Sequence, residues 1–554
     1  MNLAHVIAAA LVATLPVAAQ AQAQTPIEAP ASTQPALIVT IVVDQLGANL
    51  FNQYRGRFTG GLKTLGDQGL VYINGYQAQG ITTTCPGHAT VLTGAFPTHT
   101  GIPTNEWTDL TTGQDAYCLA APKNTIADGS AGENGPVGPD NMRVTTMADW
   151  LKAASPTSRI YAVSGKDRGA ITLAGHTPDG AFWLAEGFGM TTYLEPGQTA
   201  AERLAPIAEF NAAYVSHYKA TPVTNWTVRH PACLAMAGTS TIGGQTFTAG
   251  LPPMNYSLEN SPALDETTLA AAADLLDRQQ LGRRGVTDML GVSLSGTDKI
   301  GHGYGTQGPE MCEQMMRLDA ALGDFLGQLT EVPGGVVVVL TADHGGSDFP
   351  ERMSDRGAVA GRYDPTLLPR INEKLMAQFS LAEAPLYSAG TGFIVADARR
   401  VSLAEPLRSQ VIAAAVPLLN AEPNIVLAVA RDTLLAEPMP ARDADPEELT
   451  VRERLRLSAV QGRGADILRA YAPNLTSSAR IGGSIASHGS AWDYDRRVPI
   501  IFWTPGGQAQ ERFWPIRTVD IAPSLAHLVG LTPPVEIDGR CLHLFDESPC
   551  PVAP

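Results

Sequence analysis

The chain has 554 residues, of which 44% are hydrophobic and 17% are charged. This length implies one large core with insertions or two to three units, and the composition is globular rather than disordered. The net charge of −16 argues against a nucleic-acid-binding or anionic-membrane-binding surface, so an anionic ligand must be attracted locally.

The first residues form an apolar run, LAHVIAAALVATLPVAAQAQAQ, that ends in small side chains. Two Ala-Gln-Ala triplets fit a signal-peptidase site, so we predict a signal peptide over residues 1–23, although no Lys or Arg precedes the run. A membrane anchor is the alternative, but the run is short for a span and no later segment reaches transmembrane length. We therefore expect a periplasmic or secreted protein with no membrane span after signal removal, and a flexible lead over residues 24–35.

Apolar runs bounded by turn residues then recur along the chain. They lie at residues 36–43, 159–164, 286–294, 335–341 and 498–503. Near-continuous Val/Ile/Leu runs suit central parallel strands, and helix-like patterns at 311–329 and 518–531 alternate with them. The sequence therefore predicts an α/β fold with a doubly wound, mainly parallel sheet, in which ligands bind beyond the carboxyl ends of the strands.

Two stretches do not follow this alternation of strands and helices, and we predict that they are cap insertions over the site. Residues near 170–260 are rich in Gly, Pro, Thr and aromatic residues, and residues near 350–480 mix helix-like, β-like and charged segments. Loops of that length in a compact fold usually carry function or their own structure. We expect one catalytic domain over residues 36–554.

Six side chains of the metal-ligand type border the predicted strands. Asp44 follows PALIVTIVV, Asp298 and His302 follow VTDMLGVSLSG, Asp343 and His344 follow GGVVVVLTA, and His488 lies ahead of VPIIFW. Each alone reads as a turn, cap or surface residue. Together, buried carboxylates and imidazoles need a compensating charge, and three Asp with three His are the ligand mix for two zinc ions.

A threonine opens a predicted helix among these residues. Thr84 begins TCPGHATVLTG, where Thr is a good N-cap and Pro is tolerated in the first turn. In isolation it would be a plain capping residue, but the metal-type cluster favours a metal-activated nucleophile. Because helix-start amides also favour a phosphoryl anion, the suggested chemistry is hydrolysis of a phosphate ester.

Two cations, Lys166 and Arg168, lie in AVSGKDRGA after another predicted strand. Flanking Asp167, they would usually form a surface ion-pair cluster. At a strand's carboxyl end they could bind phosphoryl oxygens, Arg bidentately and Lys as a point charge. Asn105, in GIPTNEW, could donate to another phosphoryl oxygen, although by itself it reads as a turn residue.

Six cysteines in an exported chain allow disulfides, with fifteen possible pairings. They are Cys85, Cys118, Cys233, Cys312, Cys541 and Cys550. Cys541 with Cys550 is the simplest pairing because it closes a short C-terminal loop. Cys85, beside the proposed nucleophile, is predicted to be a small packing residue rather than a catalyst.

The chain resembles the alkaline phosphatase superfamily, and within it the exported phosphate-irrepressible alkaline phosphatases with a threonine nucleophile. The resemblance runs from about Ile38 to Leu544 and rests on IVVDQ, TTTCPGHATVLTG, GIPTNEW, SGKDR, GTDKIGHGYG, LTADHGG, SHGSAWDYDRRVPIIFW and TVDIAPSLAHLVG. It implies one zinc on Asp44, Asp343, His344 and Thr84, and another on Asp298, His302 and His488. It also implies that Asn105, Lys166 and Arg168 bind the phosphoryl group.

The cationic pair bears on the substrate class. Related nucleotide pyrophosphatase/phosphodiesterases keep the Thr, the Asn and both metals but lack it, and Lys166 with Arg168 would compensate the extra charge of a monoester. The resemblance therefore implies a zinc-dependent alkaline phosphatase that acts on small-molecule phosphate esters through a phosphothreonine, with broad specificity and some diesterase activity. We expect the protein to be a monomer. A phosphodiesterase or nucleotide pyrophosphatase on the same scaffold is the alternative.

Overall fold

Residues 34–220, 226–250, 258–390, 392–477, 479–534, 537–545 and 550 are described by a computed structural model. The predicted signal peptide and nearly all of the predicted lead lie outside the described residues.

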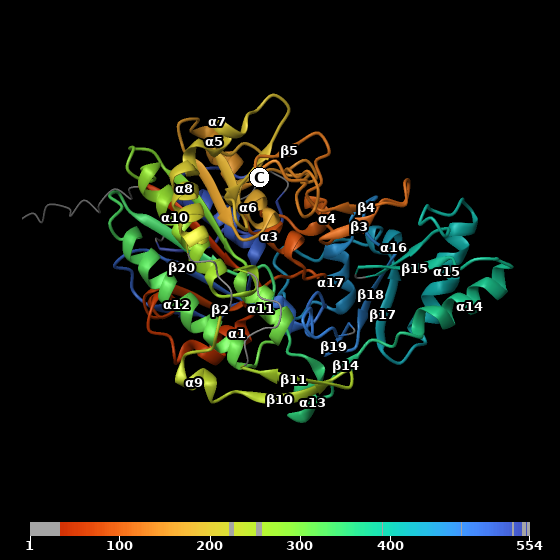
Figure 1. The fold of residues 1–554 in the computed structure, drawn as a ribbon. Coiled ribbons are helices and arrows are strands. Elements are labelled where there is room, and N and C mark those ends of the chain that lie inside the picture. Colours follow the sequence, from red (N-terminus) through yellow and green to blue (C-terminus); the bar gives the residue numbers. More distant parts are fainter. Residues whose placement is uncertain are drawn as a thin grey trace, which may run out of the picture. The chain divides into compact units, whose positions relative to one another are not determined.

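One large sheet of ten strands forms the centre of the fold (Figure 1). In order along the sheet the strands are β21 (Gln510–Arg512), β2 (Leu70–Tyr76), β20 (Arg497–Trp503), β13 (Val336–Thr341), β1 (Leu37–Val43), β12 (Asp288–Leu294), β6 (Ile160–Ser164), β7 (Gly180–Ala185) and β8 (Gly189–Thr191), while β22 (Ile516–Arg517) also pairs with β2. Each apolar run singled out above is a strand of this sheet. The predicted fold class, a mainly parallel α/β sheet, is confirmed.

The direction of β20 differs from the prediction. β13, β1, β12, β6 and β7 run parallel, whereas β20 is antiparallel to both of its neighbours, β13 and β2. The run at 498–503 was predicted to be a parallel strand, which is wrong: a strand buried on both faces is apolar in either direction, so hydrophobicity does not reveal its sense. Because β20 is reversed, its first residues lie at the edge where β1, β12 and β13 end.

Two groups of helices pack against the sheet. The first is α10 (Ala263–Arg278) with α12 (Pro309–Leu329), α2 (Gly61–Gln68) and α11 (Gly296–Tyr304). The second is α6 (Asp167–Ala174) with α3 (Thr84–Thr93), α5 (Met147–Ala154) and α19 (Ile521–Leu528). The helix-like patterns at 311–329 and 518–531 correspond to α12 and to the η3 turn (Thr518–Asp520) with α19.

Both stretches that we expected to be insertions carry structure of their own. Within 170–260, β7 and β8 extend the central sheet, and β10 (Gly238–Ile242) with β11 (Gln245–Ala249) forms a separate hairpin. Within 350–480, a second sheet has the order β15 (Leu386–Ala389), β16 (Gly392–Val395), β18 (Ile467–Tyr471), β17 (Ile425–Ala430). Helices α14 (Leu367–Phe379) and α15 (Leu407–Asn420) lie beside this sheet (Figure 1), and they share an apolar cluster with it.

The remaining elements are short and connect these parts. They are α1 (Ala48–Arg55), α4 (Pro97–Thr100), β3 (Glu106–Thr108), β4 (Asp115–Tyr117), β5 (Thr125–Ile126), β9 (Tyr193–Leu194), α7 (Ala200–Leu204), η1 (Ala205–Ile207), α8 (Ala208–Ala220), α9 (Pro231–Leu234), η2 (Leu258–Asn260), α13 (Pro350–Asp355), β14 (Gly361–Arg362), α16 (Arg431–Leu435), α17 (Val451–Ser458), β19 (Leu475–Thr476) and α18 (Asp493–Arg496).

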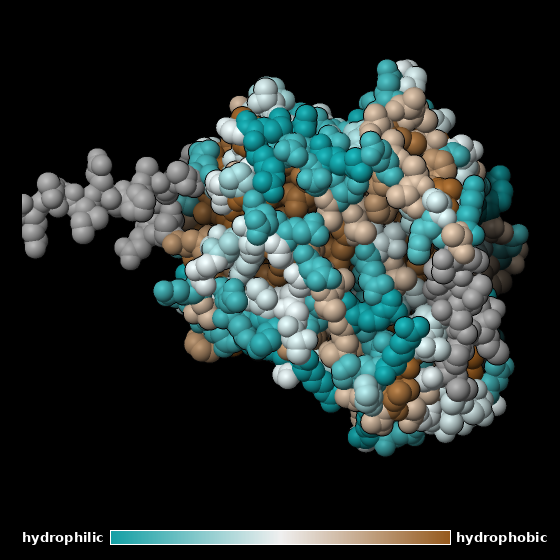
Figure 2. All heavy atoms as spheres, turned by 60° about the vertical axis from the view of Figure 1, so that its left-hand side comes forward, coloured by the Kyte–Doolittle hydropathy of each residue, from teal (hydrophilic) through white to brown (hydrophobic). Residues whose placement is uncertain are grey.

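On the face drawn in Figure 2, hydrophilic residues are interleaved with small groups of hydrophobic ones. Among the described helices, none combines the length and the apolar character that crossing a bilayer needs.

All six cysteines are paired, as Cys85–Cys118, Cys233–Cys312 and Cys541–Cys550. The predicted pairing of Cys541 with Cys550 is confirmed. The prediction that Cys85 is merely a packing residue is wrong, because its partner lies 33 residues along the chain, a distance that the sequence pattern does not reveal.

Candidate metal centre and phosphoryl site

The metal-type residues meet at one edge of the central sheet. Asp44 follows β1, Asp298 and His302 lie in α11 after β12, Asp343 and His344 follow β13, and His488 lies ahead of β20. His488 reaches this edge because β20 runs opposite to its neighbours. Residues from both ends of the sequence are thus brought together.

Asp298, His302 and His488 form one cluster. Nε2 of His302 lies 3.3 Å from Oδ1 of Asp298, and Nε2 of His488 lies 3.4 Å from the same oxygen. Asp298 and His302 share a face of α11 because they are four residues apart. The ligand atoms of the three residues lie close enough together to hold one ion. The side chain of His302 is 28% exposed, so this cluster is open to solvent.

Asp44, Asp343 and His344 form a second cluster, which is fully buried. Nε2 of His344 lies 3.4 Å from Oδ1 of Asp44 and 3.4 Å from Oδ2 of Asp343. Within the described part of the chain, Oδ1 of Asp44 and Nε2 of His344 have no hydrogen-bond partner. Because unpaired buried polar atoms are costly, facing lone pairs of this kind fit a cation between them.

The two clusters adjoin, since Asp298 also lies within metal-binding reach of Asp44 and His344. The pKa of Asp44 is raised well above its ordinary value, mainly by burial and further by the negative charges of Asp298 and Asp343. Burial likewise lowers the pKa of His344 to about 3, which keeps that imidazole neutral, as a metal ligand must be. Three carboxylates this close ionise together only with positive charge among them.

The three imidazoles are held in the same way. Nδ1 of His302, His344 and His488 each lies 2.9 Å from a backbone carbonyl oxygen. The carbonyls belong to Ala486, Gly345 and Thr82, respectively. A carbonyl only accepts, so Nδ1 carries a proton, and Nε2 is the nitrogen that faces the carboxylates and could bind a metal ion. This is the tautomer and support that a metal-binding histidine requires.

Thr84 is the first residue of α3 and is almost completely buried. Its neighbours in sequence contact both clusters. The carbonyl of Thr82 accepts from His488 at 2.9 Å, and Nδ1 of His88 lies 3.0 Å from Oδ2 of Asp343. The first turn of α3 therefore lies against both clusters.

Lys166 lies between the two clusters and is buried. Its Nζ is 2.5 Å from Oδ2 of Asp44 and 2.5 Å from Oδ2 of Asp298. Arg168, on α6, donates to the hydroxyl of Tyr117 at 3.3 Å, and that hydroxyl donates to Asp167 at 2.6 Å. The segment SGKDR therefore does not form the exposed ion-pair cluster that was its alternative interpretation.

Asn105 is held against the start of α3. Its Oδ1 accepts from the backbone N–H of Cys85 at 2.8 Å, and its carbonyl accepts from the N–H of Cys118 at 2.9 Å. The disulfide joins these two cysteines. Since Oδ1 is engaged, the amide orientation is fixed and its NH₂ group is the part left for a ligand.

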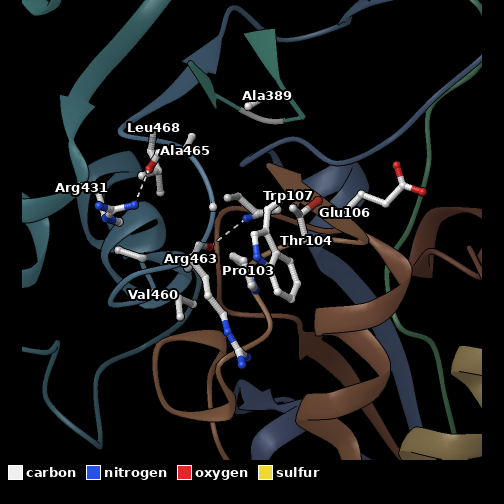
Figure 3. A pocket seen from close by; sticks show the side chains of 14 residues that line it. Pro103, Thr104, Glu106, Trp107, Ala389, Arg431, Val460, Arg463, Ala465 and Leu468 are labelled. Carbon is white, nitrogen blue, oxygen red and sulfur yellow. Dashed lines mark hydrogen bonds between the residues drawn. The ribbon is translucent and has the colours of Figure 1, made fainter. Parts of the chain in front are cut away.

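Arg463 supports the loop that carries Asn105 (Figure 3). Its guanidinium donates to the carbonyls of Gly101 at 2.8 Å and Asn141 at 2.7 Å, and lies 5.2 Å from the ring centroid of Trp107. Trp107 is in β3, directly after Asn105. A residue from the 350–480 stretch thus fixes a site loop, and no sequence pattern indicated it.

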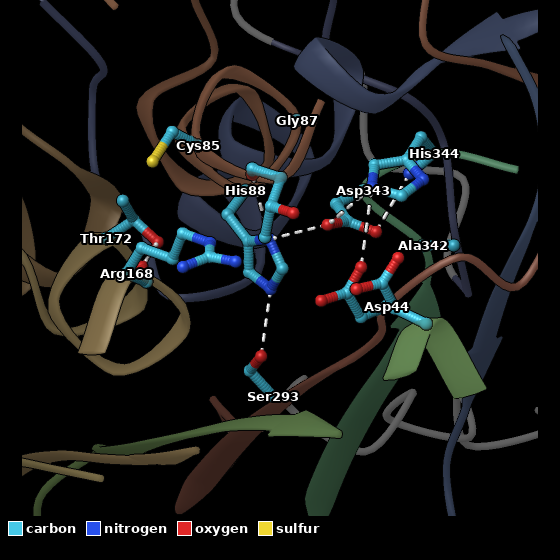
Figure 4. Close-up of polar contacts among 12 residues, drawn as sticks. Asp44, Cys85, Gly87, His88, Arg168, Thr172, Ser293, Ala342, Asp343 and His344 are labelled. Carbon is cyan, nitrogen blue, oxygen red and sulfur yellow. Dashed lines mark hydrogen bonds and ion pairs between the residues drawn. The ribbon is translucent and has the colours of Figure 1, made fainter. Parts of the chain in front are cut away.

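Sequence reasoning gave no role to His88, which contacts the buried cluster (Figure 4). Its Nε2 lies 2.9 Å from Oγ of Ser293, and its Nδ1 faces both Asp343 and the Thr84 carbonyl, the latter at 3.1 Å. The four-residue spacing from Thr84, which puts both on one helix face, was the available signal. Gly87 permits this approach, since a Cβ there would be 2.1 Å from the Asp343 carbonyl oxygen.

Gln45, likewise missed, links the two clusters. Its N–H donates to Oδ1 of Asp343 at 3.1 Å, and its Nε2 donates to Oδ1 of Asp298 at 3.3 Å. Its φ of 67° is left-handed, which is uncommon for a residue other than glycine and is concentrated at functional sites.

The chain is similar to a described protein family and to several alkaline phosphatases. The model of the type I phosphodiesterase / nucleotide pyrophosphatase family matches residues 38–366. Alkaline phosphatase PhoK of a Sphingomonas species is 38% identical over 566 residues, 98% of each chain. Alkaline phosphatase PhoD of Zymomonas mobilis is 35% identical over 93% of this chain and 89% of its own. The crystal structure of alkaline phosphatase PafA has the same fold, with a TM-score of 0.79 and 23% identity over 93% of this chain and 99% of that chain.

Proposed function

Because the chain belongs to the type I phosphodiesterase/nucleotide pyrophosphatase family of the alkaline phosphatase superfamily, we propose that it is an exported, zinc-dependent alkaline phosphatase. It is a phosphatase enzyme, since relatives that match nearly its whole length are alkaline phosphatases. The proposed reaction is hydrolysis of small-molecule phosphate monoesters by a monomer, through a phosphothreonine on Thr84, with broad specificity and some activity on diesters.

One observation supports the metal part of this proposal. In each of the three imidazoles, Nδ1 is hydrogen-bonded to a backbone carbonyl and Nε2 faces carboxylates. We assign one zinc ion to Asp44, Asp343, His344 and Thr84, and the other to Asp298, His302 and His488. When bound, two such ions lower the pKa of a coordinated hydroxyl and stabilise a departing alkoxide.

Thr84 carries the covalent step in this scheme. Its Oγ, once deprotonated, attacks phosphorus, so that an O–P bond forms as the ester P–O bond breaks, and the leaving alkoxide takes a proton from water. Water then attacks the phosphothreonine, and phosphate leaves as the hydroxyl is restored. The position of Thr84 at the start of α3, against both clusters, supports this role, because the positive end of a helix dipole stabilises charge on phosphoryl oxygens.

Lys166, Arg168 and Asn105 bind the phosphoryl oxygens. The position of Lys166 between Asp44 and Asp298 supports this role for it. From there its Nζ would turn toward an incoming phosphate dianion. Asn105 offers its NH₂ group, because its oxygen is held by the Cys85 N–H. The two cations balance the second negative charge of a monoester, and catalysis is then mainly positioning and electrostatics.

The alternative is a phosphodiesterase or nucleotide pyrophosphatase, the activity after which the matching family model is named. Rates on 4-nitrophenyl phosphate and bis-4-nitrophenyl phosphate, each with and without chelator, separate the two. A faster monoester rate that chelator abolishes and zinc restores supports the proposal. A faster diester rate favours the alternative, and an unchanged rate without metal overturns both.

Export rests on the predicted signal peptide together with the pairing of every cysteine in disulfides. Such bonds persist in oxidising compartments, which supports a periplasmic or secreted location. We also retain the proposal that the stretches near 170–260 and 350–480 serve as caps, except for β7 and β8, which belong to the central sheet; the second stretch contributes Arg463 behind Asn105.

A further inference from the structure

A cavity of about 520 Å³ opens beside the proposed phosphoryl site. Its buried lining contains Lys166 and Asp298, and Arg168 and His302 also border it. Its more exposed lining comes from β11, from α11 and from the loop at 480–484. The cavity therefore runs outward from the place where the bond to the leaving group would break.

The outer wall is built onto the helix that carries Asp298 and His302. The N–H of Ile485 donates to the carbonyl of His302 at 2.8 Å, while the imidazole of His302 donates back to Ala486. Across the cavity, Phe247 of β11 packs on Tyr304 of α11, with ring centroids 6.5 Å apart. This wall is consequently fixed relative to the proposed metal ligands.

Two cations of this wall, Lys299 and Arg480, are not used by the proposed phosphoryl site. Lys299 pairs with Glu259 at 3.2 Å, and both side chains are partly exposed, so the pair is worth little and can exchange. Arg480 makes no side-chain hydrogen bond or ion pair with another described residue. Its backbone is held in a turn by hydrogen bonds with Ser484 and Gly483, both of 2.9 Å.

These cations stand out because the chain as a whole has a net charge of −16. The cavity is lined by four cationic side chains and one carboxylate, Asp298, which the proposed metal site uses. With Lys166 and Arg168 assigned to the phosphoryl group, Lys299 and Arg480 remain to face whatever the phosphoryl group is attached to. A second anion on the leaving group would meet positive charge at this point.

We propose that this cavity is a leaving-group subsite that favours phosphate monoesters whose alcohol carries a second anionic group, a carboxylate or a further phosphate, held by Lys299 and Arg480. The inference rests on the proposed phosphatase function. Phe247 is only 8% exposed and so serves as a wall against the carbon skeleton rather than as an open platform for an aromatic leaving group.

A matched pair of esters tests the subsite. 3-Phosphoglycerate and glycerol 3-phosphate share the phosphorylated carbon and differ in a carboxylate against a hydroxymethyl group. The readout is the ratio of kcat/KM for 3-phosphoglycerate to kcat/KM for glycerol 3-phosphate, which cancels changes in the common phosphoryl step. Wild type is compared with Arg480→Ala, Arg480→Lys, Arg480→Glu and Lys299→Ala. Arg399→Ala is the control, since that side chain is 82% exposed and does not line the cavity.

We expect a ratio above one in wild type, and a fall of about threefold to tenfold in Arg480→Ala, the range for loss of one charged contact that water partly replaces. Arg480→Lys should keep most of the ratio, Arg480→Glu should lower it further, and added salt should reduce it in wild type. Equal losses of kcat/KM on both esters would overturn the proposed subsite, as would a ratio that is the same whatever the charge at residue 480. Wild type that hydrolyses neither ester would instead overturn the proposed function.

Discussion

The imidazole rings of His344 and His488 stack, with centroids 3.7 Å apart and planes 14° apart. One ring belongs to each proposed ligand set, so the two clusters are in contact through these stacked rings. Each Nδ1 is tied to a separate backbone carbonyl. A change in one cluster is therefore expected to disturb the other.

Removal of a ligand should show this dependence. Asp298→Ala or His302→Ala should reduce bound zinc from two ions per chain, collapse activity, and lower the melting temperature if metal binding is coupled to folding. Elemental analysis, activity and thermal denaturation are measured on the same preparations. His217→Ala, an exposed residue of α8, is the matched control. A fully active protein that holds no metal after chelation would rule out the scheme.

The nucleophile is tested by two substitutions at one position. Thr84→Ala should abolish turnover because it removes the attacking oxygen, while other ligands retain zinc. Thr84→Ser should keep measurable activity because it retains the hydroxyl. Steady-state rates on an aryl phosphate monoester, with zinc content determined in parallel, check both. Wild-type rates from the alanine variant would remove Thr84 from the mechanism.

Lys166 and Arg168 should govern the preference for monoesters. Truncation of either to Ala should slow monoester hydrolysis by roughly tenfold to a hundredfold, far more than diester hydrolysis, because a diester lacks the second charge. The double variant need not show the product of the single effects, since both groups hold one phosphoryl group.

The measurement for this pair is kcat/KM on an aryl monoester and a matched diester. Zinc content must be determined as well, because Lys166 also separates Asp44 from Asp298. Equal losses on both substrates with full zinc would assign the pair a structural role.

His88 should act through Asp343 rather than on substrate. His88→Ala removes the Nδ1–H that lies 3.0 Å from Oδ2 of Asp343, and loss of such a supporting contact typically costs about 10- to 100-fold in metal affinity or activity. His88→Asn, whose NH₂ group can replace that donor, should recover part of the loss. Zinc affinity by chelator competition is the readout, and unchanged affinity in the alanine variant contradicts the assignment.

The pair His176 and Asp149, remote from the metal-type residues in sequence, predicts a pH-dependent contribution to stability. Nδ1 of His176 lies 3.1 Å from Oδ2 of Asp149, and this hydrogen bond raises the pKa of His176 above its ordinary value. Because the pKa of His176 is higher in the folded than in the unfolded protein, the pair stabilises the fold fully at pH values below the unfolded pKa of about 6.5. This stabilisation is lost as the pH rises through the folded-state pKa. Burial acts to raise the pKa of Asp149, but the hydrogen bonds from His176 and Thr146 and the charge of His176 together lower it, so the contribution of Asp149 to stability is lost only under more acidic conditions.

His176→Ala should accordingly reduce the melting temperature more at about pH 6 than at about pH 9. Thermal denaturation of wild type and variant at both pH values measures the difference. An equal reduction at both would show that packing, and not the ion pair, is what the substitution removes.

The strands that carry the site could be predicted from the sequence, because a buried strand leaves a continuous apolar run. The proposed ligands Asp44 and Asp343 follow such runs directly. The direction of a strand cannot be read from its hydrophobicity. His488 was grouped with the other metal-type residues, and the structure brings it to them, although β20 runs opposite to its neighbours. His88, Gln45 and Arg463 were missed because their roles depend on distant partners. Gln45, for example, contacts residues 253 and 298 positions away, which no local pattern reveals.

His488 lies ahead of β20, and β20 inserts between β2 and β13, so the site is completed by one of the last segments to be made. At about 5–20 residues per second, synthesis of the chain as far as this segment takes on the order of half a minute to a minute and a half. During that interval Asp44, Asp298 and Asp343 can already exist on a nascent chain that lacks His488 and has a gap in its sheet. A chain that stops before residue 488 would therefore keep Asp44, Asp298 and Asp343 yet lack the histidine that completes the proposed centre.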